Sequence, residues 1–142
     1  MYAAVRQAPV GLVWPSKGEG KREPKSVPGC RRGDHWRMVP TKPGTAHGRL
    51  VLINRNYWMT FVQRRLATVI GDAGCLSLWG RLRADNKPAS ADLHRMFAEH
   101  CTAVTRKRVT VDGTESDQWD DLTGRDVHFL DGLVGCAVLG EM

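Results

Sequence analysis

Trp119 to Met142 read WDDLTGRDVHFLDGLVGCAVLGEM, and the chain is organised around this segment. Gly124 predicts a turn, and Asp126 can cap the start of a helix with its side-chain oxygen. Apolar residues then recur at helical spacing, namely Phe129, Leu130, Leu133, Val134, Ala137 and Val138. The pattern predicts an apolar helix that must pack against a large surface.

A single acid lies inside this helix. Asp131 shares one side of it with Val127, Gly135 and Val138. An acid followed by a glycine one turn later leaves open space beside the carboxylate, as a metal ligand on the floor of an active site requires. The alternative is an aspartate at the helix edge that points to water, and spacing alone favours this alternative.

Length and composition indicate a globular protein. The chain has 142 residues, of which 42% are apolar and 25% charged, so we expect a single domain over residues 1–142 with its own core. No run approaches the ~20 apolar residues of a membrane span, and Met1–Val13 does not resemble a signal peptide. Widely spaced cysteines indicate reduced thiols and a cytoplasmic location, the four being Cys30, Cys75, Cys101 and Cys136.

The net charge of +6 is unevenly distributed along the chain. Residues 1–50 hold 10 Lys/Arg and 3 Asp/Glu, which gives +7, and residues 51–108 hold 10 and 4, which gives +6. Residues 109–142 hold 1 and 8, which gives −7. A basic body can hold phosphates and an acidic end can hold divalent metal, although ordinary domains also show such a distribution.

Strands and helices alternate in the sequence, which predicts a mixed α/β or α+β fold. Arg49–Ile53 is apolar enough for a buried strand, and the residues from Trp58 to Ile70 form an amphipathic helix that Gly71 ends. A second helix begins at Ser90 or Asp92, with an inner stripe of Leu93, Met96, Phe97, His100 and Val104. The other expected elements are strands at Leu12–Trp14, Leu76–Trp79 and Arg106–Val111, and a hairpin turn with a strand at Gly33–Val39.

Basic side chains suggest where a phosphodiester could bind. Ser16–Arg22 is a glycine-rich basic loop that lacks the order of a Walker A motif. Lys17, Lys21 and Arg22 can contact phosphates there, and Arg64 and Arg65 can do so from the first helix. For both segments a solvated surface is the alternative. Trp36, among three arginines, can stack on a base or anchor its loop to the core.

Other chemistries lack their sequence signatures. The cysteines and histidines include no C-x-x-C and no H-E-x-x-H, so a structural zinc is not indicated. Cys101 has no identifiable catalytic partner, and no nucleophile elbow or standard DNA- or RNA-reading motif is present.

The order of several motifs resembles the C-terminal part of the nuclease domain of bacteriophage terminase large subunits of the lambda (GpA-type) class. The matching segments run along nearly the whole chain, and the last is the most specific because it resembles the closing N-H-x-x-D-C helix of that family. They are Trp14–Gly18 (P-S-K-G), Gly33–Trp36 (G-x-x-W), Asn54–Trp58 (N-x-x-x-W) with Phe61–Leu66, His94–Ala103, and Trp119 with His128–Ala137.

The resemblance implies a function in viral DNA packaging. Family members cut concatemeric DNA with an RNase H-like nuclease whose acids hold Mg²⁺ or Mn²⁺, and by resemblance Asp131 matches the last of those acids. It also implies double-stranded DNA as partner, with the terminase small subunit or the portal as a further partner, in the cytoplasm of a bacterial host.

Departures from the family pattern limit the expected activity. Val127 and Gly132 replace the family's Asn and Cys, and Met59 and Val104 replace its Lys and Glu. There is no ATP-binding loop, and no Asp or Glu precedes Trp14, where the other nuclease acids lie in the family. One carboxylate cannot clamp two metals. We therefore expect a truncated nuclease portion that does not cut DNA alone, and the alternative is a non-catalytic basic module that binds DNA or a packaging partner.

Overall fold

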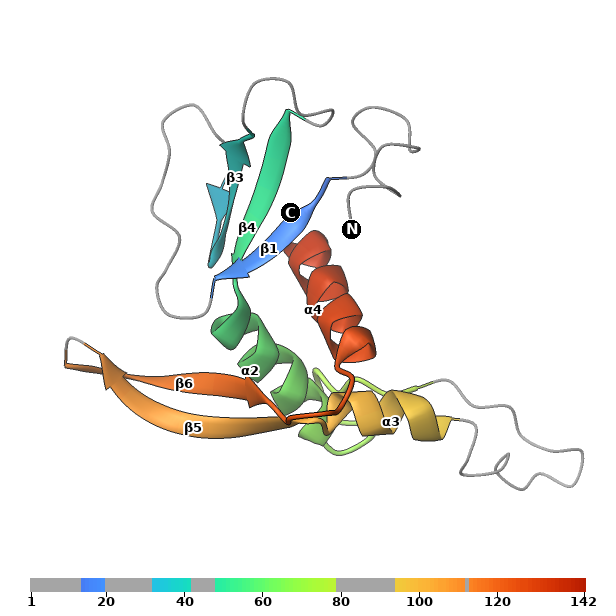
Figure 1. Ribbon diagram of the computed structural model, residues 1–142. Helices are drawn as coiled ribbons and strands as arrows, with labels where there is room; N and C mark the ends of the chain where they lie inside the picture. The colour runs from blue at the N-terminus through green and yellow to red at the C-terminus, as the bar shows by residue number, and fades with distance from the viewer. Residues whose placement is uncertain (1–13, 20–31, 42–47, 79–93, 112) are drawn as a thin grey trace, which may run out of the picture. The chain divides into compact units, whose positions relative to one another are not determined.

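The computed structural model describes residues 14–19, 32–41, 48–78, 94–111 and 113–142. Within these ranges the chain forms three helices and two small sheets, which is a mixed α+β architecture (Figure 1). Two compact units share the chain: unit 1 comprises residues 1–58 and 135–142, and unit 2 comprises residues 59–134. The expectation of one domain over residues 1–142 stays a prediction.

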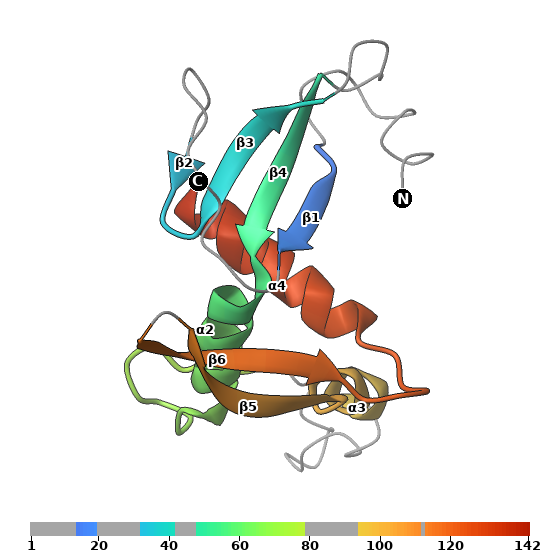
Figure 2. The same ribbon diagram turned by 60° about the vertical axis from the view of Figure 1, so that its left-hand side comes forward.

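Unit 1 contains a four-stranded sheet in the order β1-β4-β3-β2 (Figure 2). Strand β1 pairs in parallel with β4, whereas β4 with β3 and β3 with β2 are antiparallel. The bounds are β1 Ser16–Glu19, β2 Arg32–Gly33, β3 Trp36–Pro40 and β4 Arg49–Asn54. The predicted hairpin and buried strand are confirmed. The predicted loop over Ser16–Arg22 is wrong for Ser16–Glu19, which form β1 and pair with β4, and residues 20–22 lie outside the described residues.

One face of this sheet forms the core of unit 1. Trp36 and Met38 of β3 lie on it with Val51 and Ile53 of β4, and all four are at most 7% exposed. The last part of helix α4 (His128–Glu141) belongs to the same unit and buries Val138. Strand β3 alternates between buried and less buried residues, as a strand with one covered face does, whereas β4 buries Val51, Leu52 and Ile53 in succession.

Helix α2 (Arg55–Ala67) follows β4 directly. The side-chain oxygen of Asn54 accepts the backbone N–H of Tyr57 at 3.2 Å, as an N-cap does. The predicted helix is confirmed, but it ends four residues before Gly71. Its predicted last apolar members are wrong, because Val69 and Ile70 lie beyond the helix and are 70% and 82% exposed.

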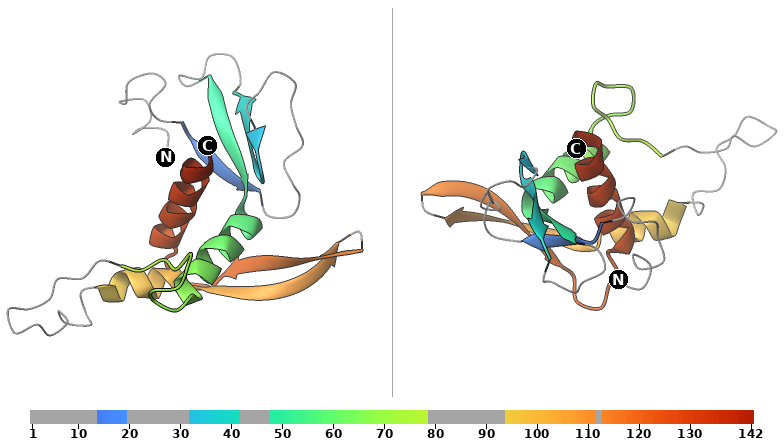
Figure 3. Two further views of the ribbon diagram at one scale, coloured as in Figure 1. Left: turned by 180° about the vertical axis from the view of Figure 1, so that it is seen from behind. Right: turned by 90° about the horizontal axis from the view of Figure 1, so that it is seen from above.

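Unit 2 contains a short helix and a long β-hairpin. Helix α3 spans Arg95–Cys101 and buries Cys101 rather than the predicted Met96, which is 60% exposed. The hairpin pairs β5 (Val104–Val111) with β6 (Thr114–Asp121) along its whole length (Figure 3). The predicted strand at Leu76–Trp79 is wrong for residues 76–78, which form no strand, and Trp79 lies outside the described residues.

Strand β6 has the polar sequence TESDQWDD, and side-chain contacts attach it to α2. Trp119 Nε1 donates to Thr60 Oγ1 at 2.9 Å, and Thr60 Oγ1 donates to Asp117 at 3.2 Å. Asp117 also lies 3.8 Å from the guanidinium groups of both Arg106 and Arg108 on β5. Polar bonds of this kind stabilise a strand that has little apolar surface to bury.

Helix α4 begins at His128, one residue later than a cap at Asp126 predicts. The turn at Gly124 is confirmed by its φ of 75°. The carboxylate of Asp126 lies 3.6 Å from Nε2 of His128, and the N–H of Phe129 donates to Nδ1 of His100 on α3 at 3.4 Å. A histidine from another element thus meets the first turn of the helix. The buried stripe of α4 consists of Leu130, Val134 and Val138, together with Val127, which directly precedes the helix.

Candidate nucleic-acid interface

Positive charge is concentrated in unit 1. Its residues include 11 Lys/Arg and 4 Asp/Glu, a net charge of +7, whereas unit 2 has 10 and 11, a net charge of −1. The basic strand β5 does not change this balance, because Lys107 lies 2.9 Å from Asp120 and Arg108 lies 3.6 Å from Glu115. An anionic ligand is therefore attracted to unit 1 more strongly than to unit 2.

The polar face of the unit 1 sheet is the face opposite the core face, and it also carries Leu52. Basic residues on neighbouring strands lie side by side on this face. Lys17 of β1 and Arg37 of β3 both pair with Leu52 of β4, and Arg32 of β2 pairs with Arg37. Directly paired residues share a face, so these positions form a row across the four strands. Lys17 is exposed, and no ion pair involves it within the described residues.

Arg37 has a structural role in the same row. Its guanidinium lies 3.8 Å from the carboxylate of Glu19 on β1, and its side chain is 15% exposed. The pair joins β3 to β1 across β4, on the face that carries the buried Leu52. Of the two cations, Lys17 is the one available to a ligand.

The carboxyl ends of the parallel strands β1 and β4 meet the start of α2. A Cβ atom at Gly18 would lie 3.1 Å from Cβ and Cδ of Arg55, so the Arg55 side chain passes close to β1. At the same end, His35 of the β2–β3 turn stacks on Tyr57, with ring centroids 3.6 Å apart and planes inclined by 19°. Ligands commonly bind at such strand ends.

The predicted DNA-binding residues fall into different environments. Lys17 and Arg64 are exposed. Arg65 is held by the fold, since Nη1 donates to the Gly74 carbonyl at 3.1 Å and the guanidinium lies 4.2 Å from the Phe61 ring centroid. Lys17 belongs to unit 1 and Arg64 and Arg65 to unit 2, and the predicted Lys21 and Arg22 lie outside the described residues.

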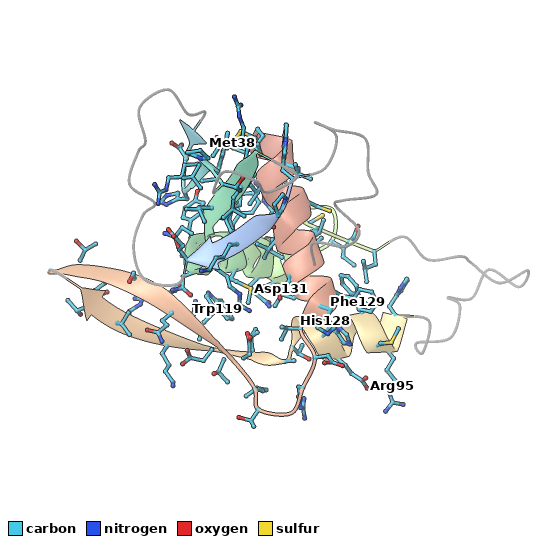
Figure 4. The ribbon with its side chains drawn as sticks, turned by 45° about the horizontal axis from the view of Figure 1, so that its top comes forward. Met38, Arg95, Trp119, His128, Phe129 and Asp131 are labelled. Atoms are coloured by element: carbon cyan, nitrogen blue, oxygen red, sulfur yellow. The ribbon has the colours of Figure 1, made fainter. Side chains whose placement is uncertain are left out.

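Asp131 is exposed on α4 (Figure 4), whereas Val127 and Val138, which were predicted to share its side of the helix, are buried. A Cβ atom at Gly132 or Gly135 would meet no other atom within 4 Å, so the helix surface at these two glycines is open. Within the residues that the structure describes, no three His, Cys, Asp or Glu side chains are grouped to hold a metal ion. These residues therefore do not by themselves fit a two-metal nuclease centre.

The structure adds a pair that sequence analysis missed, His35 with Tyr57. These residues are 22 positions apart in the sequence, and the bend of the β2–β3 hairpin brings them together. Two features of the sequence could have indicated this pair. His35 lies in a predicted hairpin turn, and Tyr57 lies in the first turn of the helix that follows the predicted strand Arg49–Ile53.

Cys101 is a buried thiol at the end of α3. It is 6% exposed, and burial raises the pKa of its thiol above the ordinary value. Its carbonyl accepts a hydrogen bond from Nε2 of Gln63 at 2.7 Å. The arrangement indicates a structural role, because a raised pKa disfavours the reactive thiolate.

We expect Cys101 to react with iodoacetamide at pH 8 far more slowly than the exposed Cys136 in the native protein. In urea both thiols should react at similar rates, and peptide mass spectrometry separates them. Because the folded-state pKa is raised, the neutral thiol stabilises the fold below its unfolded-state pKa, and this contribution is lost as pH rises through the folded-state value. Equal native rates for the two cysteines would contradict the burial of Cys101.

The segments that resemble the terminase nuclease also have clear structural roles. Asn54 caps α2, Trp58 is 3% exposed, and Trp36 donates from Nε1 to the Glu141 carboxylate. No helix among the described residues is long and apolar enough to cross a membrane. No family model matches the chain, and neither curated proteins nor solved structures gave a match.

Proposed function

We propose that this chain is a basic nucleic-acid-binding module that binds double-stranded DNA through unit 1. The observation that carries the proposal is the segregation of charge, +7 in unit 1 against −1 in unit 2. Binding that rests on phosphate contacts requires such a surface and no metal ion. Exposed Lys17 on the polar face of the sheet is the side chain to which we assign a phosphate contact.

The family framework of this proposal is the terminase large subunit. In that framework the chain corresponds to the C-terminal part of an RNase H-like nuclease domain that lacks most of the catalytic acids. The motif order supports the framework, with packaging proteins such as the small subunit or the portal as further partners. The described residues offer one candidate metal ligand, Asp131, so any remaining ligands for Mg²⁺ or Mn²⁺ must come from elsewhere.

The test is anisotropy of a fluorescent DNA duplex titrated with the full chain in EDTA at several salt concentrations. We expect affinity to fall steeply with salt, and Lys17→Ala to weaken binding and lower the salt slope by about 1. Lys107→Ala is the matched control, because Asp120 already neutralises that lysine, and it should leave binding unchanged. Salt-independent binding, or equal effects of the two lysine variants, would contradict the proposal.

A nuclease is the second candidate, favoured by the exposed position of Asp131 on α4. It predicts plasmid cleavage that depends on Mg²⁺ or Mn²⁺ and is lost in Asp131→Ala. The binding module predicts no cleavage and unchanged DNA affinity in the same variant. One pair of proteins, wild type and Asp131→Ala, therefore separates the two functions.

A further inference from the structure

Tyr57 is the exposed member of a stack of two rings. It is 40% exposed, while His35 beneath it is half-buried. The centroid separation of 3.6 Å and the inclination of 19° are those of parallel stacked rings. A third planar group that stacked on Tyr57 would extend an arrangement that already exists.

The stack is held in place from both sides. The His35 carbonyl accepts the N–H of Asn54 at 2.8 Å and Nε1 of Trp58 at 3.4 Å. Tyr57 is fixed by the Asn54 cap and by edge-to-face contact with the buried Trp58, at 5.3 Å and 88°. Rings that are already ordered lose little conformational entropy when a ligand binds.

The backbone of His35 adopts a conformation that few side chains favour. Its φ is 60°, and it is the one positive-φ residue other than glycine within the described ranges. Histidine tolerates this region better than most residues, but the conformation is still uncommon and concentrates at functional sites. Here it turns the imidazole onto Tyr57.

The surroundings of the stack favour an anion. Arg55 is two residues before Tyr57 and passes close to Gly18 of β1, next to the exposed Lys17 in the sequence. Of the acids in unit 1, Glu19 pairs with Arg37, and the Glu141 carboxylate accepts hydrogen bonds from the Asp34 N–H and from Nε1 of Trp36. Unit 1 as a whole has a charge of +7. A flat aromatic surface with basic side chains suits the bases and phosphates of a single strand.

We infer that Tyr57, supported by His35, stacks on an unpaired base of single-stranded nucleic acid while Arg55 and Lys17 contact the adjoining phosphates. This inference rests on the proposed nucleic-acid-binding function and adds to it a site for an unpaired base. A duplex keeps its bases stacked inside and offers no free base to Tyr57. The module therefore binds strand ends, gaps and single strands with a contact that it cannot make to a continuous duplex.

The experiment measures binding of the full chain to a single strand that contains 2-aminopurine, and to a covalently closed circular duplex that contains the same sequence and has neither strand ends nor unpaired bases. We expect quenching of 2-aminopurine by wild type, and a loss of roughly tenfold in single-strand affinity in Tyr57→Leu with little change for the duplex. Tyr57→Trp keeps a stacking ring and should retain binding. DNA and RNA strands are compared to identify which backbone the site accepts.

Phe129→Leu is the matched control, because Phe129 is 41% exposed but lies in unit 2. It should leave single-strand binding unchanged, and circular dichroism confirms that each variant is folded. The inference fails, while the proposed function stands, if Tyr57→Leu binds the single strand as tightly as wild type does. It also fails if Phe129→Leu and Tyr57→Leu weaken single-strand binding equally. If neither strand nor duplex binds at low salt, the proposed function itself fails.

Discussion

Replacement of Leu130 by alanine is expected to lower the free energy of unfolding by about 2–5 kcal/mol. Leu130 is 0% exposed and lies in the buried stripe of α4 between Val127 and Val134, which are 8% and 2% exposed. Truncation removes buried methyl groups and leaves a cavity that the neighbouring side chains fill only in part. A loss of this size is a large fraction of the stability of a small protein.

Leu139→Ala provides the matched control on the same helix. Leu139 is 64% exposed, so the same chemical change there should alter stability by less than about 0.5 kcal/mol. Leucine and alanine both favour helices, so the comparison isolates packing from helix propensity. Urea unfolding followed by circular dichroism measures both variants, and Leu130→Met should cost less than about 1.5 kcal/mol. Similar losses at positions 130 and 139 would show that the stripe is not a core.

Elements with apolar periodicity could be predicted from the sequence. Strand β4, helix α2 and helix α4 each bury a continuous apolar set, and their existence follows from the spacing of that set. The mixed α+β class follows from their order. The end of α2 could not be predicted in this way, because Val69 and Ile70 continue the apolar pattern past Ala67 but are exposed.

Strands β1 and β6 could not be predicted because their side chains carry no alternation. The sequence of β1 is SKGE, and its place in the sheet comes from backbone bonds to β4. Strand β6 is held by its register with β5 and by ion pairs such as Lys107 with Asp120. Pairing between distant segments determines such strands, and local sequence does not contain that information.

The candidate site was predicted in part. The excess of cations pointed to phosphate binding, and for the exposed Lys17 this stays a prediction. The stack of His35 and Tyr57 depends on a left-handed residue in a hairpin turn and on the junction of β4 with α2, so composition and spacing do not indicate it. The metal-ligand hypothesis for Asp131 stays a prediction, because its support is the family resemblance.

Replacement of Trp36 by alanine is expected to lower the free energy of unfolding by about 3–5 kcal/mol. Trp36 is 4% exposed on the core face of the unit 1 sheet, and its Nε1 donates to Oε2 of Glu141 near the end of α4. The other oxygen of that carboxylate accepts the backbone N–H of Asp34 at 3.4 Å. Removal of the indole therefore opens a cavity and also frees the carboxylate that links the β2–β3 turn to α4.

Trp36→Phe separates these two contributions. The phenyl ring retains most of the buried surface but cannot donate to Glu141, so a loss of about 1.5–3 kcal/mol is expected for the hydrogen bond to a charged group. Glu141→Gln should weaken the same bond, and the Trp36→Phe, Glu141→Gln double variant should lose less than the sum of the single losses. Additive losses in urea unfolding would show that the bond contributes nothing, and would leave the indole's packing as its whole role. A coupled pair would show instead that the end of α4 is fastened to the turn that carries His35, so that damage to Glu141 should also weaken single-strand binding at Tyr57.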